Sequence, residues 1–478
     1  MATVDHPAGI VLKSAYDPRT RSYNLNQSTL AKARAAHARG LNGGKPMQLH
    51  FLGHSYMTGF QSAAPYPTNT SPAQVTRLLD ASGRMGKVAE GHRVLSYGST
   101  LGARLSDDTR FTLAPEWTYI SGHGYALSSV YRNTANTGDL TFAPGVPITH
   151  FEVVYLASTV TGAWSFSTNG GAGFASTSIT ATNPTIAYFS RVISVSAEPA
   201  VASLIIRPPA SGHVMIQSIR AYTDTATSKN AIEVTNGAVS GSTAAGATVG
   251  SWTHSLNGYA STAQAITFYK PDLACIMLGT NDRNAGRTET EYINAMRTLA
   301  QQVQTAGGDV IFLREPTPTE QGFTDGLYGL ADEIGAGLIE VGPDWPSTYA
   351  NAKAEPYGYI GTDSSHPSPR GHTAIGRTVA NALLAALWAR PLGGVGLVLG
   401  VGGFALLIAV AVAAGAAVCV AVALAPVALG FNEQANEPRL QALDRCNPHA
   451  ASIGRATWRL APDPWQAPRQ TPVPGWRS

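Results

Sequence analysis

A strand that runs into a glycine-flanked serine is the feature that most constrains the fold of this chain. Residues 49–52 read Leu-His-Phe-Leu, which favours a β-strand, and Gly53-His54-Ser55 follows directly. A strand that ends in this way presents the Ser55 hydroxyl at the carboxyl edge of a sheet, where open α/β sheets bind their ligands. The same pattern also fits an ordinary turn, in which serine is a common residue.

An acid and a base about 310 residues further along the chain favour a functional serine over an ordinary turn. Asp363 and His366 stand three residues apart in the stretch Gly361 to Pro367. An unactivated serine is a poor nucleophile, so it needs a histidine to accept its proton and an acid to orient that histidine. The order Ser, Asp, His therefore predicts that Ser55, Asp363 and His366 form a catalytic triad.

Two further short sequence blocks lie between the block that contains Ser55 and the block that contains Asp363 and His366. Residues 279–282 read Gly-Thr-Asn-Asp directly after the apolar run 273–278, and residues 236–241 read Asn-Gly-Ala-Val-Ser-Gly. Together the four blocks resemble the SGNH/GDSL hydrolase superfamily in content and order. Residues 98–102 look like a second block only superficially, because no asparagine precedes them, and we interpret them as a turn.

The resemblance implies roles for the residues of the middle blocks. In the family pattern the oxyanion hole consists of two backbone N–H groups, here those of Ser55 and Ala238, and of an asparagine side chain, here Asn281. Asn281, Asp282 and Gly237 are expected to contact the substrate. The second block has Ala238 where the family has glycine, or else it is shifted so that Gly237 serves.

The residue beside the nucleophile also departs from the family pattern. The family usually has aspartate where this chain has His54. That aspartate supports the loop and does not perform the chemistry, so activity can survive at altered efficiency. Alternatively, His54 forms unproductive hydrogen bonds with Ser55.

The pattern around these blocks predicts an α/β fold. Residues 273–278 form an apolar run typical of a strand covered on both faces, and strands are also expected at 310–313 and 338–341. Helices are expected at 29–39, from Ser71, from the capping box Thr288 to Glu291, at 327–334 and at 372–388. The resemblance makes this a flavodoxin-like three-layer α/β/α SGNH domain.

The segment between the first and second blocks has a different character. Short β-prone runs separated by Gly, Pro, Asn and Ser predict an inserted antiparallel β-sandwich of jelly-roll type over residues 107–225. It resembles the carbohydrate-binding-like insertions of some SGNH proteins. Its aromatic residues are expected either to lie in the core or to stack on sugar rings, and they are Trp117, Tyr119, Tyr125, Tyr131 and Trp164.

The end of the chain is strongly hydrophobic. Residues 391–432 contain no charged residue, and the run 397–424 is long enough to span a bilayer as a helix. We expect a C-terminal hydrophobic helix within 394–430 that crosses a membrane; a helix buried in an oligomer or docked in a virion is the alternative.

The expected domain divisions of the whole chain are a lead-in (1–45), two parts of the SGNH domain (46–106 and 226–390), the insertion (107–225), the hydrophobic segment (394–430) and a disordered Pro/Arg-rich tail (431–478).

Composition excludes some classes of function. With 33 basic and 30 acidic residues, the chain offers no electrostatic case for a nucleic acid partner. The three cysteines lie far apart and the histidines have no ligand spacing, so neither a disulfide framework nor a metal is expected, and no cofactor is implied. The N-terminus shows no signal peptide pattern, which is compatible with a membrane-associated or a virion-associated protein.

These observations predict a serine esterase that hydrolyses an acyl ester, with an acetyl group on a carbohydrate as the expected substrate. The rival interpretation is an SGNH-fold glycan-binding protein or phage tail adhesin with little or no turnover. The composition resembles that of SGNH proteins of actinobacteria and their phages. A membrane-anchored cellular enzyme is the third possibility. The oligomeric state is left open.

Overall fold

The computed structural model describes most of the chain. The described residues are 12–59, 61–62, 66–95, 108–120, 130–133, 138–174, 177–225, 229–246, 262–316, 323–342, 345–346, 348–388, 395–401, 404–411 and 419–426. The chain divides into two compact units, residues 1–388 and 389–478. Residues 98–102, Tyr125 and the tail 431–478 lie outside the described residues.

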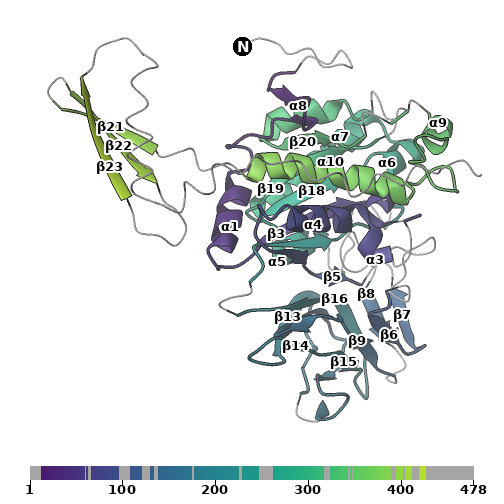
Figure 1. Cartoon of the computed structure of the whole chain (residues 1–478). Helices are drawn as coiled ribbons and strands as arrows, with labels where there is room; N and C mark the ends of the chain where they lie inside the picture. The colour runs from purple at the N-terminus through teal and green to yellow at the C-terminus, as the bar shows by residue number, and fades with distance from the viewer. Residues whose placement is uncertain are drawn as a thin grey trace, which may run out of the picture. The chain divides into compact units, whose positions relative to one another are not determined.

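A largely parallel sheet organises the first unit. Its described strands lie in the order β1-β2-β20-β19-β18-β3-β17-β4 (Figure 1). They are β1 (Tyr16–Asp17), β2 (Ser22–Tyr23), β3 (Met47–Gly53), β4 (Val88–Glu90), β17 (Ile232–Asn236), β18 (Leu273–Met277), β19 (Asp309–Arg314) and β20 (Gly337–Glu340). Neighbouring strands in the series β4-β17-β3-β18-β19-β20 pair in parallel. Within this series, the order β17-β3-β18-β19-β20 is that of flavodoxin-like sheets.

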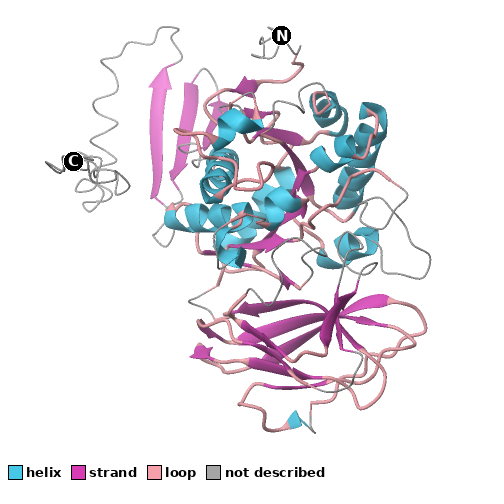
Figure 2. Cartoon of the chain, turned by 90° about the vertical axis from the view of Figure 1, so that its right-hand side faces the viewer, coloured by secondary structure: helices cyan, strands magenta, loops and turns pink. Residues whose placement is uncertain are grey.

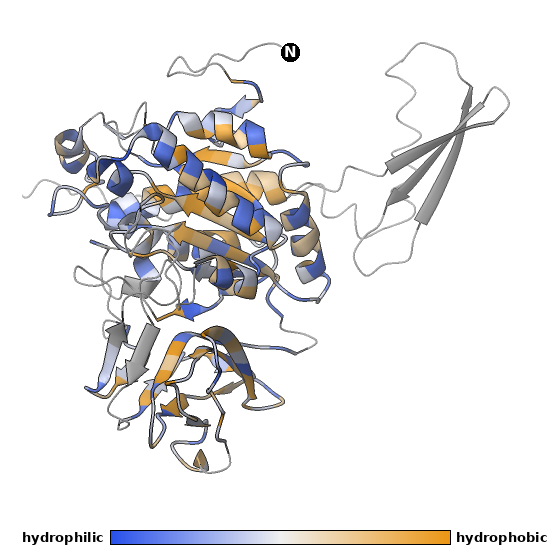
Figure 3. Cartoon of the chain, turned by 180° about the vertical axis from the view of Figure 1, so that it is seen from behind, coloured by the Kyte–Doolittle hydropathy of each residue, from blue (hydrophilic) through white to orange (hydrophobic). Residues whose placement is uncertain are grey.

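Helices cover both faces of this sheet. On one face lie α1 (Ala31–Leu41), α4 (Ser71–Ala81) and α10 (Pro369–Leu387), and on the other α5 (Thr262–Tyr269), α7 (Glu289–Thr305) and α8 (Gly326–Ile334). In β18, Leu273 and Cys275 pack toward the first group, while Ala274 and Ile276 pack toward the second. The strands between the layers are accordingly hydrophobic (Figure 3). This is the predicted three-layer α/β/α arrangement.

Local sequence signals set several helix boundaries. The capping box of Thr288 and Glu291 is present at the start of α7, as predicted. α4 begins at Ser71, as predicted, but the side chain that caps it is that of Thr70, which accepts a hydrogen bond from the Ala73 N–H; the Ser-Pro pair at residues 71–72 had suggested Ser71 as the cap. Sequence reasoning missed the hairpin of β1 and β2, whose two-residue strands are too short to show a period.

The segment 107–225 contains two antiparallel sheets, at the lower end of the view in Figure 2. One has the order β13-β11-β16-β8-β7 with β5 paired to β16, and the other has the order β12-β15-β9-β6. The strands of the first sheet are β5 (Arg93–Val94), β7 (Trp117–Ile120), β8 (Val130–Asn133), β11 (His150–Ala157), β13 (Ala187–Ser194) and β16 (Val214–Tyr222). Those of the second are β6 (Phe111–Leu113), β9 (Leu140–Phe142), β12 (Ser165–Ser167) and β15 (Leu204–Arg207), and a separate pair is formed by β10 (Pro147–Ile148) and β14 (Ala200–Val201).

At strand β11, both faces of the first of these sheets are buried. Val153 and Tyr155 of β11 belong to a core shared with the second sheet, whereas Val154 and Leu156 pack in one cluster with residues of α5. Trp117 and Trp164 lie in the shared core, 6% and 0% exposed, so they cannot stack on a sugar ring. For these two residues the sugar-stacking alternative is wrong, because their rings fill the space between the sheets.

The second unit differs from its prediction. Its described residues form three antiparallel strands, β21 (Val395–Val401), β22 (Phe404–Ala411) and β23 (Cys419–Pro426), and not a hydrophobic helix. The frequent glycines between 396 and 403 disfavour a helix, and the β-branched valines favour strands. Within the described residues, no helix is both long and apolar enough to cross a membrane, so the predicted transmembrane helix is not supported.

A buried ion-pair network joins the segment 107–225 to the parallel sheet. Arg220 of β16 forms two 2.9 Å contacts with Glu233 of β17 and one of 2.9 Å with Glu152 of β11. The Glu233 side chain is 1% exposed and the Arg220 side chain 13%. Removal of the guanidinium would therefore leave the buried Glu233 carboxylate and the partly buried Glu152 carboxylate without their shared cationic partner.

We expect Arg220→Met to lower the free energy of unfolding by about 3–5 kcal/mol, because a buried charge left without its partner is strongly destabilising. Denaturant unfolding measures this change. Arg191→Met is the matched control: Arg191 is exposed on the neighbouring strand β13 and should cost less than about 0.5 kcal/mol. Equal effects of the two variants would contradict the prediction.

Candidate active site

Ser55 lies where the central strand of the sheet ends. β3 stops at Gly53, His54 is the N-cap of the short helix α2 (Ser55–Thr58), and the Ser55 residue is 4% exposed. β3 pairs in parallel with β17 on one side and β18 on the other, with Asn236 opposite Phe51 and Met277 opposite Gly53. Because parallel strands end at the same edge, the first three sequence blocks meet there.

The structure brings the three residues of the predicted triad together. Ser55 Oγ lies 2.9 Å from His366 Nε2, and His366 Nδ1 lies 2.5 Å from Asp363 Oδ2. Ser55 comes from the start of α2, whereas His366 and Asp363 come from the loop before α10. The arrangement has the geometry of a nucleophile, a base and an acid that orients the base.

The surroundings favour the protonation states that this geometry needs. Burial lowers the pKa of His366, and this outweighs the opposite effect of Asp363, so the imidazole is neutral at neutral pH. Partial burial acts to raise the pKa of Asp363, but hydrogen bonds from the backbone N–H groups of His366 and Ser365 outweigh it and lower that pKa. A neutral imidazole beside an ionised carboxylate is able to accept the Ser55 proton.

Two side chains fix the loop that carries His366. The Tyr56 hydroxyl donates a hydrogen bond of 2.8 Å to the carbonyl of Ser365, so the residue after Ser55 holds the residue before His366. Lys353 of the short helix α9 (Tyr349–Lys353) donates to the Thr362 carbonyl at 3.0 Å and to Ser364 Oγ at 2.8 Å. Sequence reasoning missed both contacts, because Tyr56 is far from Ser365 in the chain and Lys353 reaches its partners through an irregular loop that has no sequence period.

The predicted oxyanion-hole residues differ in their suitability. Asn281, in the short helix α6 (Thr280–Asn284), donates one amide N–H to the Ser242 carbonyl at 2.9 Å, and this bond orients its side chain. The Ala238 N–H donates to Asn236 Oδ1 at 3.2 Å, and the Gly237 N–H donates to the Phe51 carbonyl at 2.8 Å. These bonds occupy both second-block donors, so the structure gives no support to Ala238 or Gly237 as a substrate contact.

Asp282 binds the protein's own backbone. Its side chain is 0% exposed and accepts hydrogen bonds from the N–H groups of Ala244 and Ala245 at 2.9 and 2.8 Å. Burial raises the pKa of Asp282 to about 6 in spite of these two donors. The prediction that Asp282 contacts substrate is therefore corrected: it fixes the segment that follows the second block.

A second histidine–carboxylate pair lies beside the nucleophile. His54 Nε2 is 2.6 Å from Glu315 Oε1, and His54 Nδ1 is 3.3 Å from Ser55 Oγ. The backbone N–H of Thr280 also donates to Glu315, at 3.1 Å. Gly279, with φ of 148°, brings the backbone close to this carboxylate, and a Cβ there would lie 3.5 Å from it. Sequence reasoning missed Glu315, although it directly follows β19 at the same sheet edge.

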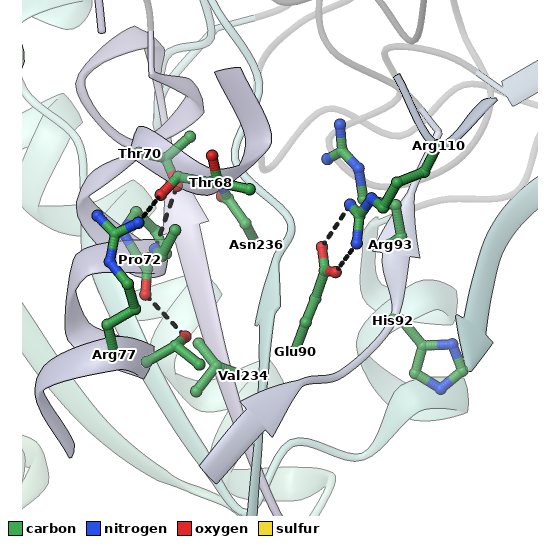
Figure 4. A pocket seen from close by; sticks show the side chains of 12 residues that line it. Thr68, Thr70, Pro72, Arg77, Glu90, His92, Arg93, Arg110, Val234 and Asn236 are labelled. Carbon is green, nitrogen blue, oxygen red and sulfur yellow. Dashed lines mark hydrogen bonds and ion pairs between the residues drawn. The ribbon is translucent and has the colours of Figure 1, made fainter. Parts of the chain in front are cut away.

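A cavity of about 200 Å³ lies beside the segment that carries Ser55. Thr68, Thr70 and Arg77 line one side, and Glu90 and Arg110 line another (Figure 4). Asn236 also lines the cavity and donates a hydrogen bond of 2.8 Å to the carbonyl of Met57, two residues after Ser55. The cavity thus presents hydroxyl, amide and charged groups, and Asn236 links it to the helix that begins at Ser55; Ser55, His366, Asp363 and Asn281 are not among its described lining residues.

Candidate metal ligands do not converge in the part of the chain that the structure describes: no group of three or more His, Cys, Asp or Glu side chains there could hold a metal ion. Cys275 is buried in β18, and burial raises the pKa of its thiol.

Comparison with known proteins identifies the fold. The structure is similar to that of a peptidoglycan O-acetylesterase, with a TM-score of 0.55 and 12% identity over 77% of this chain and 99% of that one. This is the SGNH hydrolase fold. An acetyl xylan esterase from Butyrivibrio proteoclasticus aligns with a TM-score of 0.27 and 10% identity over 58% of this chain and 98% of that one. A scan against family models gives no match, and neither does a search of curated proteins. The resemblance inferred from the four blocks is thus confirmed at the level of the SGNH hydrolase fold.

We expect Asp282→Ala to lower the free energy of unfolding by about 2–4 kcal/mol, because two buried backbone N–H groups lose their acceptor. Denaturant unfolding tests this. Glu198→Ala, at an exposed position, is the control and should change stability by less than about 0.5 kcal/mol. If Asp282→Ala is as stable as the parent, Asp282 does not have this structural role, and it becomes a candidate substrate contact again.

Proposed function

We propose that this chain is a serine esterase that removes an acyl group from a carbohydrate through an acyl-enzyme intermediate. The acyl group that we propose is acetyl. The observation that carries the proposal is the continuous hydrogen-bonded series from Ser55 to His366 to Asp363, with distances of 2.9 and 2.5 Å. A protein that only binds a ligand has no need of a base aligned on a serine and of an acid aligned on that base.

The proposed reaction has two halves. His366 Nε2 accepts the Ser55 proton as Oγ attacks the acyl carbon, and Asp363 stabilises the imidazolium that forms. The imidazolium then gives its proton to the departing sugar oxygen, which leaves an ester on Ser55. In the second half, His366 removes a proton from water as the water oxygen attacks the acyl carbon. The bond to Ser55 Oγ then breaks, His366 returns the proton to Oγ, and the acid is released.

The developing oxyanion needs hydrogen-bond donors that are already in position. We assign this role to the backbone N–H of Ser55 and to the side chain of Asn281. An amide NH₂ group has two donors, and the bond to the Ser242 carbonyl uses one of them and fixes the direction of the other. Ala238 is left out, because its N–H is bonded to Asn236.

The substrate class is inferred from two observations. The similar structure with the higher TM-score is a peptidoglycan O-acetylesterase, an enzyme that acts on an acetylated glycan. The cavity beside the Ser55 segment offers threonine hydroxyls, an asparagine and charged side chains, which are the groups that bind sugar hydroxyls, and it has room for about one sugar ring. We propose that it holds part of the carbohydrate that carries the acyl group.

The division of the first unit into domains is also a proposal. We propose that residues 107–225 are a β-sandwich inserted between the two parts of the SGNH domain, 46–106 and 226–390. The shared core of the two antiparallel sheets supports this. Arg110, just before β6, lines the cavity together with α4 residues, so the insertion would form one wall of the substrate site.

Hydrolysis of a short-chain chromogenic ester by the full chain is the primary test. We expect turnover by the parent and only background hydrolysis by Ser55→Ala, because the nucleophile is lost. Asn281→Ala should lower kcat by about 10²–10³, the usual cost of one oxyanion donor.

Ser190→Ala, at an exposed serine of β13, is the matched control and should retain parental activity. If the folded parent is no faster than folded Ser55→Ala on any ester tested, including acetylated polysaccharides, the esterase proposal is rejected. Glycan binding without turnover would then be the better description.

The proposed sugar site predicts a change in substrate preference. Thr76 of α4 lines the cavity, and a Thr76→Trp side chain should fill it. We expect the ratio of kcat/KM for an acetylated oligosaccharide to that for a short chromogenic ester to fall at least tenfold. Thr298→Trp is the matched control, because Thr298 is an exposed helical threonine with the same hydrogen bond to the carbonyl four residues earlier. An unchanged ratio would remove the cavity from the proposed substrate site.

A further inference from the structure

Ser55 lies between two imidazoles. His366 Nε2 is 2.9 Å from Ser55 Oγ on one side, and His54 Nδ1 is 3.3 Å from the same atom on the other. Each imidazole is bonded through its second nitrogen to a carboxylate, His366 to Asp363 and His54 to Glu315. The proposed mechanism uses the first pair and leaves the second unexplained.

The second pair is completely enclosed. The side chains of His54 and Glu315 are 1% and 0% exposed, and their contact distance is 2.6 Å. Thr280 donates to Glu315 through both its backbone N–H and its hydroxyl. Burial of a carboxylate without such partners would be costly, so the site holds Glu315 by several hydrogen bonds.

The contacts of Glu315 determine which nitrogen of His54 carries a proton. Burial acts to raise the pKa of Glu315, but the attraction of His54 and the hydrogen bonds from His54 and Thr280 outweigh it and lower that pKa. An ionised carboxylate has no hydrogen to donate, so the proton of the 2.6 Å contact belongs to His54 Nε2. With Nε2 as the donor to Glu315, Nδ1 is the nitrogen of this ring that can act as an acceptor.

A second contact supports the same tautomer. The backbone N–H of Tyr56 points at His54 Nδ1, 3.4 Å away, as in an N-cap. A backbone N–H can only donate, so this nitrogen carries a lone pair. The Ser55 hydroxyl, which has one proton to give, therefore has a candidate acceptor on each side.

We propose that His54 and Glu315 form a second histidine–carboxylate pair that acts on Ser55, with His54 Nδ1 as an additional general base and Glu315 as its positioning residue. The proposal rests on the proposed esterase function. On this route the Ser55 proton passes to His54 Nδ1, Oγ forms the bond to the acyl carbon, and the bond between that carbon and the sugar oxygen breaks. The proton on Nδ1 then goes to the departing oxygen, and Glu315 balances the charge of the imidazolium in the interval.

The shorter contact makes His366 the main base, so the second base is best observed in its absence. A purely structural role of His54 is to cap α2, and asparagine can fill this role, because its side-chain oxygen is a good N-cap acceptor and not a base at neutral pH. His54→Asn therefore separates the capping role from the catalytic one.

The experiment compares His366→Ala, His54→Asn, the double variant and Ser55→Ala in the full chain. Two readouts are measured: hydrolysis of a short-chain chromogenic ester and the rate at which a fluorophosphonate labels Ser55, followed by intact mass. We expect His366→Ala to lose about 10²–10⁴ in rate and to stay measurably above Ser55→Ala. Addition of His54→Asn should remove this residual activity, and Glu315→Gln in the His366→Ala background should lower it at least tenfold.

Thermal unfolding of each variant shows that the comparison is made between folded proteins. If His366→Ala falls to the level of Ser55→Ala in both readouts, or if its residual rate is unchanged by His54→Asn, the second base does not exist and His54 is only a helix cap. If the parent itself equals Ser55→Ala in both readouts, the esterase function fails, and the second base fails with it. The two failures are therefore distinguishable.

Discussion

The parallel pairing of β3 with β17 and β18 is the constraint on which the site depends. It places the ends of three strands at one sheet edge, and each strand delivers a sequence block there: the Ser55 block, the second block and the Asn281 block. Both faces of the sheet are covered by helices, so the strands cannot shift without exposing buried side chains. A rigid edge is what a serine nucleophile requires, because its base and its oxyanion donors come from other segments.

The side chains at this edge are of two kinds. Asp282 is buried and bonded to the protein itself, and it fixes the segment that follows the second block. Ser55 and His366 are bonded to each other through their reactive atoms, Ser55 Oγ and His366 Nε2. Tyr56 connects the two parts of the candidate triad, since it follows the nucleophile and holds the loop of the base. The position of His366 thus depends on the same short helix that presents Ser55.

The histidine in place of the usual aspartate has a different meaning in the folded chain than in the sequence. In the sequence, His54 is a lost negative charge. In the structure, Glu315 supplies a carboxylate from the end of β19, so the acidic group remains near the nucleophile with an imidazole between them. This arrangement explains how the first block can depart from the family pattern while the fold stays that of an SGNH hydrolase.

The sequence by itself determined the fold class, the capping box of α7 and the residues of the candidate triad, because these depend on local periodicity and on short motifs at strand ends. Only the tertiary structure decided the hydrogen-bond partners of Asp282, Glu315 and the Gly237 N–H, because partners from distant segments are invisible in a linear pattern. The same limit applies to Trp117 and Trp164, whose burial depends on a second sheet. The helix expected within 394–430 was wrong for a local reason: an apolar run of this composition fits strands as well as a helix, and its glycines and valines favour strands.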